Sequence, residues 1–332
     1  RTMTRSLVVM ADWLEECGVT LAAMESTATY WKPVFYCLEE RMECWLLNAA
    51  HMKAVPGRKT DVKDAEWIAQ LLEHGLLTPS FVPPPQIRQL RNLTRYRSQL
   101  MGDRARDADR LEKLLEDASI KLTSVASNIT GTSSREMLHA LVDGERDPAV
   151  MSDMAYSTLR RKIPDLTEAL TGRFDEHHAV LVGALLTRLE HTEAALRQID
   201  AELAVRMMPF ARQLELLQTI PGIGLVTAQV FIAETGGDMT RFGSPEQLPA
   251  WVGVAPAVHE SAGKRTPAGS RRGNKWLCSM LVEAANSASR TKNTYLASQF
   301  KRIASRRGHG RAAVAVAHSM LVSAYWMLVR DE

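Results

Sequence analysis

Two aspartates in the segment "GRKTDVKDAEW" lie three positions apart among basic residues. If the segment begins a helix, Asp61 and Asp64 lie on the same side of it, because residues three apart are neighbours on a helix surface. The neighbouring cations are Arg58, Lys59 and Lys63. One interpretation is helix capping, since aspartate is a good N-cap and is favourable in the first turn. The other is a metal site that meets a phosphate.

Capping requires one carboxylate and does not account for Glu25, which ends the apolar segment "VTLAAME". In open parallel sheets, ligands gather at the carboxyl ends of the strands. Three acids there would repel one another, and a divalent cation with a preference for hard oxygen ligands, Mg²⁺ or Mn²⁺, would remove that cost. We therefore predict that Asp61 and Asp64 cap a helix and, with Glu25, bind a metal that activates a phosphodiester. Nearby cations would contact the nucleic-acid backbone.

The elements that must position these acids alternate between helix and strand. Helical periodicity and short apolar runs predict helix, strand, helix, strand and helix over residues 4–16, 19–25, 30–41, 44–50 and 64–77. This alternation is typical of a parallel α/β sheet. The proline run in "FVPPPQ" predicts the first domain boundary, so that the α/β domain spans residues 1–85.

Residues 86–210 are expected to be all helical. Leucines repeat at helical spacing after Ile87, and a second long helix has apolar positions separated by four or three residues: Leu181, Leu185, Leu189, Thr192, Leu196, Ile199 and Leu203. Such spacing is heptad-like. It predicts a coiled-coil pair of long helices, antiparallel within one chain or paired between two chains, and the sequence leaves both arrangements open.

The third region, residues 211–332, opens with "LLQTIPGIGLVTAQVFIAETG", which has the pattern of a helix-hairpin-helix. Gly222 and Gly224 allow close backbone approach, and the next helix begins with unpaired N–H groups. Together these features could bind a DNA phosphate. A tight turn between two helices that binds nothing has the same pattern.

Positive charge is concentrated in this region although the whole chain carries only +3. Between His259 and Arg311 there are twelve Lys and Arg residues and two acids, a local net charge of +10. A solvated charged face usually mixes both signs, whereas segregated charge favours a polyanion such as nucleic acid. The cations expected to bind it include Lys264, Arg265, Arg271, Arg272 and Lys275.

Several other classes are disfavoured. No continuous apolar run reaches the ~18 residues of a membrane span. The four cysteines contain no CxxC pair, and the nine histidines lack metal-ligand spacing, so neither a disulfide framework nor a zinc site is expected.

Four segments together carry a family resemblance. In order they are "MESTATYWKPV", "AVPGRKTDVKDAEW", "TIPGIGLVTAQVFIAETG" and "ESAGKR" followed by "GNKWL". The chain resembles the DEDD transposases of bacterial insertion sequences, in the branch related to Piv-type DNA invertases, some of which are guided by an element-encoded RNA. The resemblance covers essentially the whole chain.

The resemblance implies an RNase-H-like (RuvC-like) fold for residues 1–85, with an Asp-Glu-Asp-Asp set that holds Mg²⁺. Glu25, Asp61 and Asp64 match its last three acids. The first aspartate is expected on a strand upstream of Arg1, and Asp12, in a helical pattern, is a poor candidate for it. The glycine usual in the glutamate motif is Ala28 here, which is expected to alter the local turn without removing a ligand.

The resemblance also implies a catalytic serine in the C-terminal region, which is Ser261 in "HESAGKRTPAG". Such a serine attacks DNA and holds it as a phosphoserine. From the residues alone Ser261 would be a loop serine, although Lys264 and Arg265 could stabilise a phosphoryl transition state. No triad surrounds it, so we expect the metal cluster to activate it, through apposition of domains or of protomers.

The sequence therefore predicts a transposase or site-specific recombinase that cuts and rejoins DNA. Donor and target DNA, a guide RNA, a homo-oligomer (dimer or tetramer) and a nucleoid-associated place in the bacterial cytoplasm are the implied partners and location. Two alternatives stay open: a metal-dependent junction resolvase in which Ser261 is structural, and a nucleic-acid-binding protein with an inactive nuclease domain.

Overall fold

The computed structural model describes the chain except residues 1, 49–60, 257–258, 262–263 and 267–272. For 61–62, 259–261 and 264–266 it describes the backbone. The chain divides into two compact units, Arg1–Pro84 and Pro85–Glu332.

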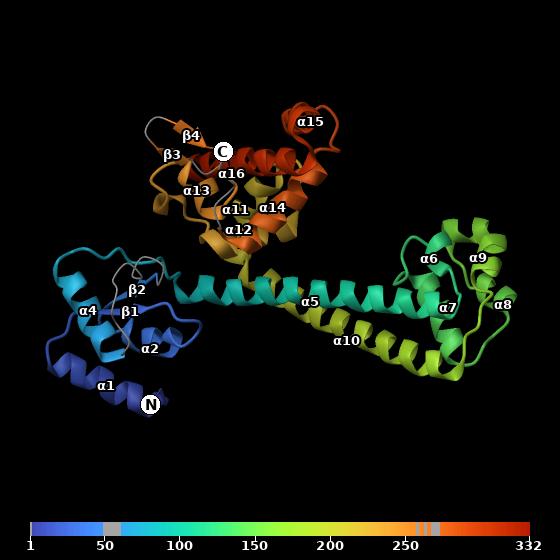
Figure 1. The fold of residues 1–332 in the computed structure, drawn as a ribbon, viewed down its shortest axis with the longest axis horizontal. Helices are drawn as coiled ribbons and strands as arrows, with labels where there is room; N and C mark the ends of the chain where they lie inside the picture. The colour runs from blue at the N-terminus through green and yellow to red at the C-terminus, as the bar shows by residue number, and fades with distance from the viewer. Residues whose placement is uncertain (1, 49–60, 257–258, 262–263, 267–272) are drawn as a thin grey trace. The chain divides into compact units, whose positions relative to one another are not determined.

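The first unit is a small α/β layer (Figure 1). Its elements are α1 (Thr4–Glu16), β1 (Leu21–Glu25), α2 (Trp31–Leu38), β2 (Glu43–Leu47) and α4 (Asp61–Glu73). The strands pair in parallel, from Leu21 opposite Glu43 to Glu25 opposite Leu47. The predicted order of elements and their parallel pairing are therefore confirmed, with helix α4 beginning three residues earlier than the apolar pattern indicated.

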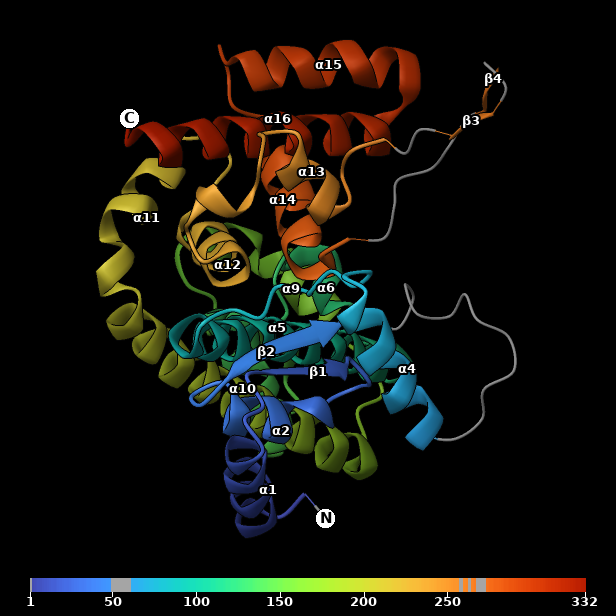
Figure 2. The same cartoon turned by 90° about the vertical axis from the view of Figure 1, so that its left-hand side faces the viewer.

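The core of this unit forms where α1 packs on α2 and α2 packs on both strands. Six buried apolar side chains fill it: Leu7, Ala11, Phe35, Leu38, Leu46 and Leu47. Helix α4 packs against β1, and Figure 2 shows it beside the arrowhead ends of the two strands. The carboxyl end of β1 therefore lies near α4 as well as beside β2.

The turn after β1 contains a non-glycine residue in the left-handed region. Ala28 has φ 47°, a conformation that costs a residue with a Cβ roughly 1–2 kcal/mol but costs glycine little. The motif that this segment resembles has glycine at the same place. Ala28 thus adopts a backbone conformation that glycine favours, and the expected change of the local turn stays a prediction.

The second unit is built on two long helices, α5 (Pro85–Asp117) and α10 (Glu176–Arg206), which lie side by side (Figure 1). Three ion pairs run along them in opposite sequence order: Arg97–Asp200, Arg104–Glu193 and Arg188–Asp107. The helices are therefore antiparallel within one chain, which is the first of the two arrangements that the sequence allowed.

The apolar face of α10 differs from the prediction in its first turns. Leu189, Leu196, Ile199 and Leu203 are buried as expected, but Leu181 is 46% exposed. Leu185 is partly buried, and Val182 and Leu186 are the buried residues at this end. The reason is that α10 also packs against α7 here. This contact buries a face of α10 that its heptad-like pattern does not indicate.

Short helices between α5 and α10 form a separate apolar cluster at one end of the pair. They are α6 (Leu122–Val125), α7 (Thr132–Val142), α8 (Pro148–Asp153), the 3₁₀ helix η1 (Ser157–Lys162) and α9 (Ile163–Ala169). Met137, Leu138 and Leu166 are fully buried among them. The long pair thus connects this cluster to the C-terminal helices (Figure 1).

The C-terminal helices share a second core with the start of α5. The elements are η2 (Met208–Phe210), α11 (Ala211–Gln218), α12 (Leu225–Thr235), η3 (Met239–Arg241), α13 (Gln247–Val252), β3 (His259–Ser261), β4 (Lys264–Thr266), α14 (Lys275–Ala288), α15 (Tyr295–Arg307) and α16 (His309–Arg330). Figure 2 shows β3 and β4 as a hairpin that extends from the helices.

Helix α16 has the length and apolar composition of a membrane span, which the search for continuous apolar runs did not detect. It packs against α14 and α15. Ala312, Val316, Met320 and Leu321 are fully buried in the C-terminal core. This is the environment of a core helix.

In the turn between α11 and α12, Gly222 allows close helix packing. Gly222 has φ 90°, and a Cβ there would lie 2.2 Å from the carbonyl oxygen of Ala284 and 2.9 Å from the nitrogen of Ala288, both on α14. Any larger residue would have to push α14 away. Gly224 has no atom within 4 Å of an added Cβ and is exposed.

We predict that Gly222→Ala lowers the free energy of unfolding by about 1–3 kcal/mol, because it combines a strained φ with overpacking against α14. Urea denaturation measures the change. Gly224→Ala is the matched control: it lies at an N-cap in open space and should change the free energy by less than about 1 kcal/mol. Equal losses in both variants would contradict this account of Gly222.

Candidate functional site

The first candidate site lies at the carboxyl end of β1. Glu25 is the last residue of the strand and is half-buried. The backbone is fixed on both sides of it, because the Ser26 N–H donates to the Leu47 carbonyl at 2.9 Å and the Thr27 N–H donates to the Glu25 carbonyl at 2.9 Å. Parallel pairing therefore holds this carboxylate at a defined place on the sheet edge.

Helix α4 brings further acids to the same strand. Asp61 is its first residue, and Asp64 is exposed one turn later on a helix that packs against β1. Because Asp61 is the first helical residue, the N-cap position before it is residue 60, outside the described part of the chain, and capping by Asp61 stays a prediction. The Asp61 side chain lies outside the described part of the chain, as do Arg58 and Lys59, while Lys63 is described and exposed. The convergence of the three acids stays a prediction.

Pairing with cations distinguishes these acids from Asp12. The Asp12 carboxylate accepts a hydrogen bond from Arg41 at 2.5 Å. Within the described residues, Glu25 and Asp64 form no such ion pair. Asp12 is thus engaged in a surface ion pair between α1 and the turn after α2.

A different acid–histidine group meets the distance requirement of a metal site. Ligand atoms of Asp117, His177 and His178 lie within 4.8 Å of one another. However, the Asp175 N–H donates to Nδ1 of His178 at 3.1 Å, so the ring proton is on Nε2 and is directed at Asp117, 3.1 Å away. His178 has no lone pair left for a metal, and with Asp175 it caps α10.

Ser261 ends β3 in an antiparallel hairpin. Its backbone pairs with Lys264, and Glu260 pairs with Arg265. The prediction of a loop serine from the residues alone is therefore corrected to a strand end. The side chains of these residues lie outside the described part, as do Arg271 and Arg272.

The two ends of this segment meet at one place. A Cβ on Gly273 would lie 2.3 Å from the carbonyl oxygen of Val252 and 2.4 Å from the nitrogen of Gly253. The Asn274 N–H also donates to the Trp251 carbonyl at 3.2 Å. The chain thus leaves α13 and returns to α14 at one junction, with the Ser261 hairpin between.

A buried carboxylate that the sequence analysis missed lies beside this junction. Glu234, on α12, is 0% exposed. Arg95 of α5 donates to both its carboxylate oxygens at 2.7 and 2.8 Å, and the Asn274 amide donates to Oε2 at 2.7 Å. Arg91 of α5 donates to the carbonyls of Ala233 and Glu234. Burial lowers the pKa of Arg91, and the nearby Glu234 opposes this.

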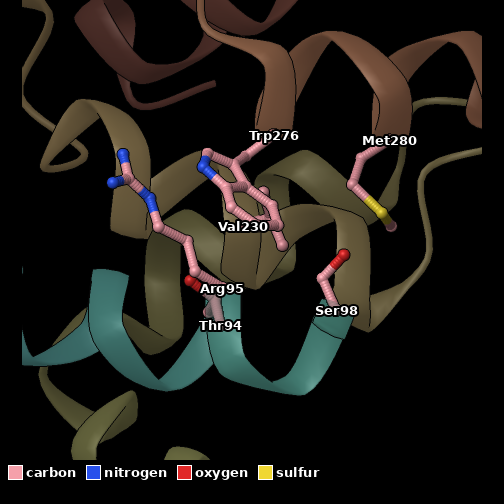
Figure 3. A pocket seen from close by; sticks show the side chains of 6 residues that line it. All are labelled: Thr94, Arg95, Ser98, Val230, Trp276 and Met280. Carbon is pink, nitrogen blue, oxygen red and sulfur yellow. The ribbon is translucent and has the colours of Figure 1, made fainter. Parts of the chain in front are cut away.

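Trp276 covers the same cluster (Figure 3). Its ring lies 5.8 Å from the Arg95 guanidinium and 4.9 Å from Nζ of Lys275. Thr94, Ser98, Val230 and Met280 complete a pocket of about 10 Å³, which is close to the volume that one water molecule needs. The cluster is therefore packed and offers no space for an organic ligand.

The remaining cations of the basic segment are exposed on α15, in the turn before it and at the start of α16. We call this the α15 surface, and its members are Arg290, Lys292, Lys301, Arg302, Arg306, Arg307 and Arg311. None of the ion pairs among the described residues involves them. Such unpaired cations are suited to phosphate groups.

Two family models match the chain. A DEDD transposase model, described as "Transposase", matches residues 2–120, and a model described as "Transposase IS116/IS110/IS902 family" matches residues 214–301. The first covers the α/β unit and runs along α5, and the second covers α11 to the middle of α15 and includes the Ser261 hairpin.

Three similar proteins come from insertion elements. The transposase for insertion sequence element IS1111A of Coxiella burnetii is 25% identical over 98% of this chain and 80% of its own length. The IS900 uncharacterized 42 kDa protein of Mycobacterium paratuberculosis is 28% identical, and the IS116 uncharacterized 44.8 kDa protein of Streptomyces clavuligerus is 25% identical. Each of these two alignments covers 82% of this chain and 72% of the relative.

The first model covers the candidate acids and the second covers the candidate serine. The relatives align along most of the chain. Along most of its length the chain is therefore similar to insertion-sequence transposases of the IS110 type, enzymes that cut and rejoin DNA.

Proposed function

We propose that this transposase uses a divalent-metal site at Glu25, Asp61 and Asp64 together with a serine nucleophile, Ser261, to exchange DNA strands. The observation that supports the metal site is the parallel pairing of β1 and β2 with α4 packed on β1, because Glu25 ends β1 and α4 begins with Asp61. An RNase-H-like, RuvC-related origin of the α/β unit fits the same arrangement.

The donor set fits Mg²⁺ or Mn²⁺. All three groups are carboxylates, the hard oxygen ligands that these ions prefer. Glu25 and Asp64 are not neutralised by an ion pair within the described residues, in contrast to Asp12, so their charge is available to a cation. When bound, the metal would supply Lewis-acid stabilisation of a phosphodiester.

Ser261 would conserve the energy of the broken bond. Its oxygen forms a bond to phosphorus while one phosphorus–oxygen bond to deoxyribose breaks, and the released sugar hydroxyl takes up a proton. The hydroxyl of another strand then attacks the phosphoserine and releases the serine. Hydrolysis would discard that bond energy, which is why a strand-exchange enzyme benefits from a covalent intermediate.

The basic segment would hold the nucleic acid. Lys264, Arg265, Arg271, Arg272 and Lys275 flank Ser261 in the sequence, and the α15 surface adds seven exposed cations. The exposed helix start at Gly224 would accept one more phosphate, as in a helix-hairpin-helix. We further propose a Piv-related, RNA-guided mode of action in a homo-oligomer, on the sequence resemblance alone.

Asp64→Asn is expected to abolish DNA cleavage in Mg²⁺, and so is Asp61→Asn, while nucleic-acid binding persists. Loss of a cap costs only about 1 kcal/mol, so the fold should survive. The measurement is cleavage of DNA that carries the element ends. Asp12→Asn is the matched control and should cut at the wild-type rate, because its carboxylate pairs with Arg41. Near-normal cleavage by either α4 variant would leave only the capping role.

Ser261→Ala is expected to eliminate recombination together with any covalent protein–DNA species, which denaturing gel electrophoresis detects. Chelation of the divalent metal should eliminate the same species. Ser305→Ala, another exposed serine among cations, should retain both. If Ser261→Ala still produces recombined DNA, the enzyme acts as a metal-dependent resolvase and Ser261 is structural.

Binding to DNA is expected to weaken steeply with salt, because each phosphate contact releases a counterion. Each contacting cation that is removed should lower the slope of log affinity against log salt by about 1. We therefore expect the slope to decrease when Arg271, Arg272 and Lys275 are replaced together by alanine. The same decrease is expected when Arg302, Arg306 and Arg307 are replaced together by alanine. Arg97→Ala, which removes a cation already paired with Asp200, should not alter the slope. An unchanged slope in both triple variants would place the binding surface elsewhere.

A further inference from the structure

We propose that Glu234, Arg95 and Asn274 form a positioning cluster that fixes the junction of the Ser261 hairpin and connects it to the long helix α5. The proposal rests on the proposed role of Ser261 in strand exchange. None of the three residues needs to touch DNA. Their role would be to hold the segment that carries the nucleophile.

The first argument is the burial of a charge. Glu234 is 0% exposed, and an ionised carboxylate is costly to bury unless cations and hydrogen bonds compensate it. Arg95 approaches in the bidentate geometry that suits a carboxylate best. An apolar side chain of similar volume would often stabilise a core equally well. The polar group is therefore better explained by the directional bonds it makes.

The second argument is the double use of Asn274. Its Oδ1 accepts hydrogen bonds from the Trp276 and Leu277 N–H groups at 3.1 Å each and so caps α14. Its Nδ2 donates to Glu234. An amide side chain of this length accepts at the cap with its oxygen and donates to the carboxylate with its nitrogen, whereas aspartate would repel Glu234 and serine is shorter and carries both functions on one atom. Asn274 thereby joins the start of α14 to α12.

The third argument is the position of Asn274 in the chain. It follows Gly273, which lies against Val252 and Gly253 so closely that a Cβ has no room. The residue that returns the hairpin to the core is therefore held from two sides, by α13 through the backbone and by Glu234 through the amide. A change at Glu234 would reach the hairpin through this residue.

The cluster also connects the hairpin to the helix pair. Arg91 and Arg95 both extend from α5 to the last turn of α12, and the Arg91 Nε donates to the Ala233 carbonyl at 3.0 Å. Figure 3 shows Arg95 beside Trp276, the second residue of α14. A displacement of α5 would move the guanidinium that orients Glu234. The position of the long helices is thereby coupled to the junction of the serine segment.

A reciprocal exchange of the two polar groups tests the proposal. Asn274→Asp keeps a good N-cap but places two carboxylates together. In Glu234→Gln, one of the two acceptor oxygens is replaced by an NH₂ group. Arg95, Asn274 or both then face a donor instead of an acceptor. In the double variant, the amide oxygen introduced at position 234 can accept from the Arg95 Nε, and the amide nitrogen can donate to the carboxylate introduced at position 274. This restores the bond between the two positions in reverse, while the Arg95 Nη2 loses its acceptor. We expect each single variant to slow formation of the covalent DNA species about tenfold or more, and the double variant to recover most of that loss.

Asp107→Asn provides a matched control for loss of stability. Asp107 is also 0% exposed and bound by arginines, Arg110 and Arg188, but within the helix pair. The thermal midpoint of the Asp107→Asn variant should fall as far as the midpoints of Asn274→Asp and Glu234→Gln. Its rate of formation of the covalent DNA species at saturating DNA should stay near the wild-type rate. An equal loss of rate in Asp107→Asn would show that only general stability is measured, and would overturn the proposal.

Two further results separate this proposal from the role of Ser261. In the first, Ser261→Ala and the double variant at positions 234 and 274 both recombine DNA, whereas Asn274→Asp alone does not. The serine is then not the nucleophile, but the cluster still positions the site. If Ser261→Ala is inactive while both single variants form the covalent species at the wild-type rate, the cluster is not a positioning device. A double variant that stays as slow as the single variants would also count against it.

Discussion

The larger unit of this transposase depends on the compensation of one buried carboxylate. Glu234 ends an apolar helix in the centre of the C-terminal core, where an unpaired charge would be intolerable. Its partners come from α5 and from the residue before α14. The three helices are therefore fixed relative to one another by bonds whose direction matters, in addition to apolar packing that fixes only volume.

The long helices α5 and α10 are also joined by arginine–carboxylate pairs at the edges of their interface, whereas the interface itself is apolar. Leucine and isoleucine fill the interface, while Arg104 and Arg135 converge on Glu193. Burial raises the pKa of Glu193, but hydrogen bonds from these two arginines outweigh it and lower the pKa overall. This carboxylate therefore stabilises the folded helix pair above the unfolded pKa of glutamate, and its contribution is lost as the pH falls through the depressed folded value.

Sequence reasoning succeeded where a local pattern determined the outcome. The alternation of helix and strand before Pro84, and the apolar seam of α10 from Leu189 onward, follow from periodicity. It failed where a contact with a residue distant in the sequence determines the structure. Glu234 reads as an ordinary acid near a helix end, and its partner Arg95 lies 139 positions away. The face of α10 near Leu181 is likewise selected by α7, whose position no local pattern gives. The acids and Ser261 came from strand ends and motif resemblance, and their side-chain convergence remains a prediction.

The two glycines of the PGIG turn illustrate why a motif alone does not assign a role. Both would be expected in a phosphate-binding hairpin, because glycine lets a backbone approach its ligand. Gly222, however, is required by α14, whose backbone occupies the space that a Cβ would need. Gly224 lies in the open at the start of α12. Any phosphate bound by this turn must therefore be held at Gly224 and the first N–H groups of α12, while Gly222 keeps α14, and with it Asn274 and the Ser261 junction, close to that helix.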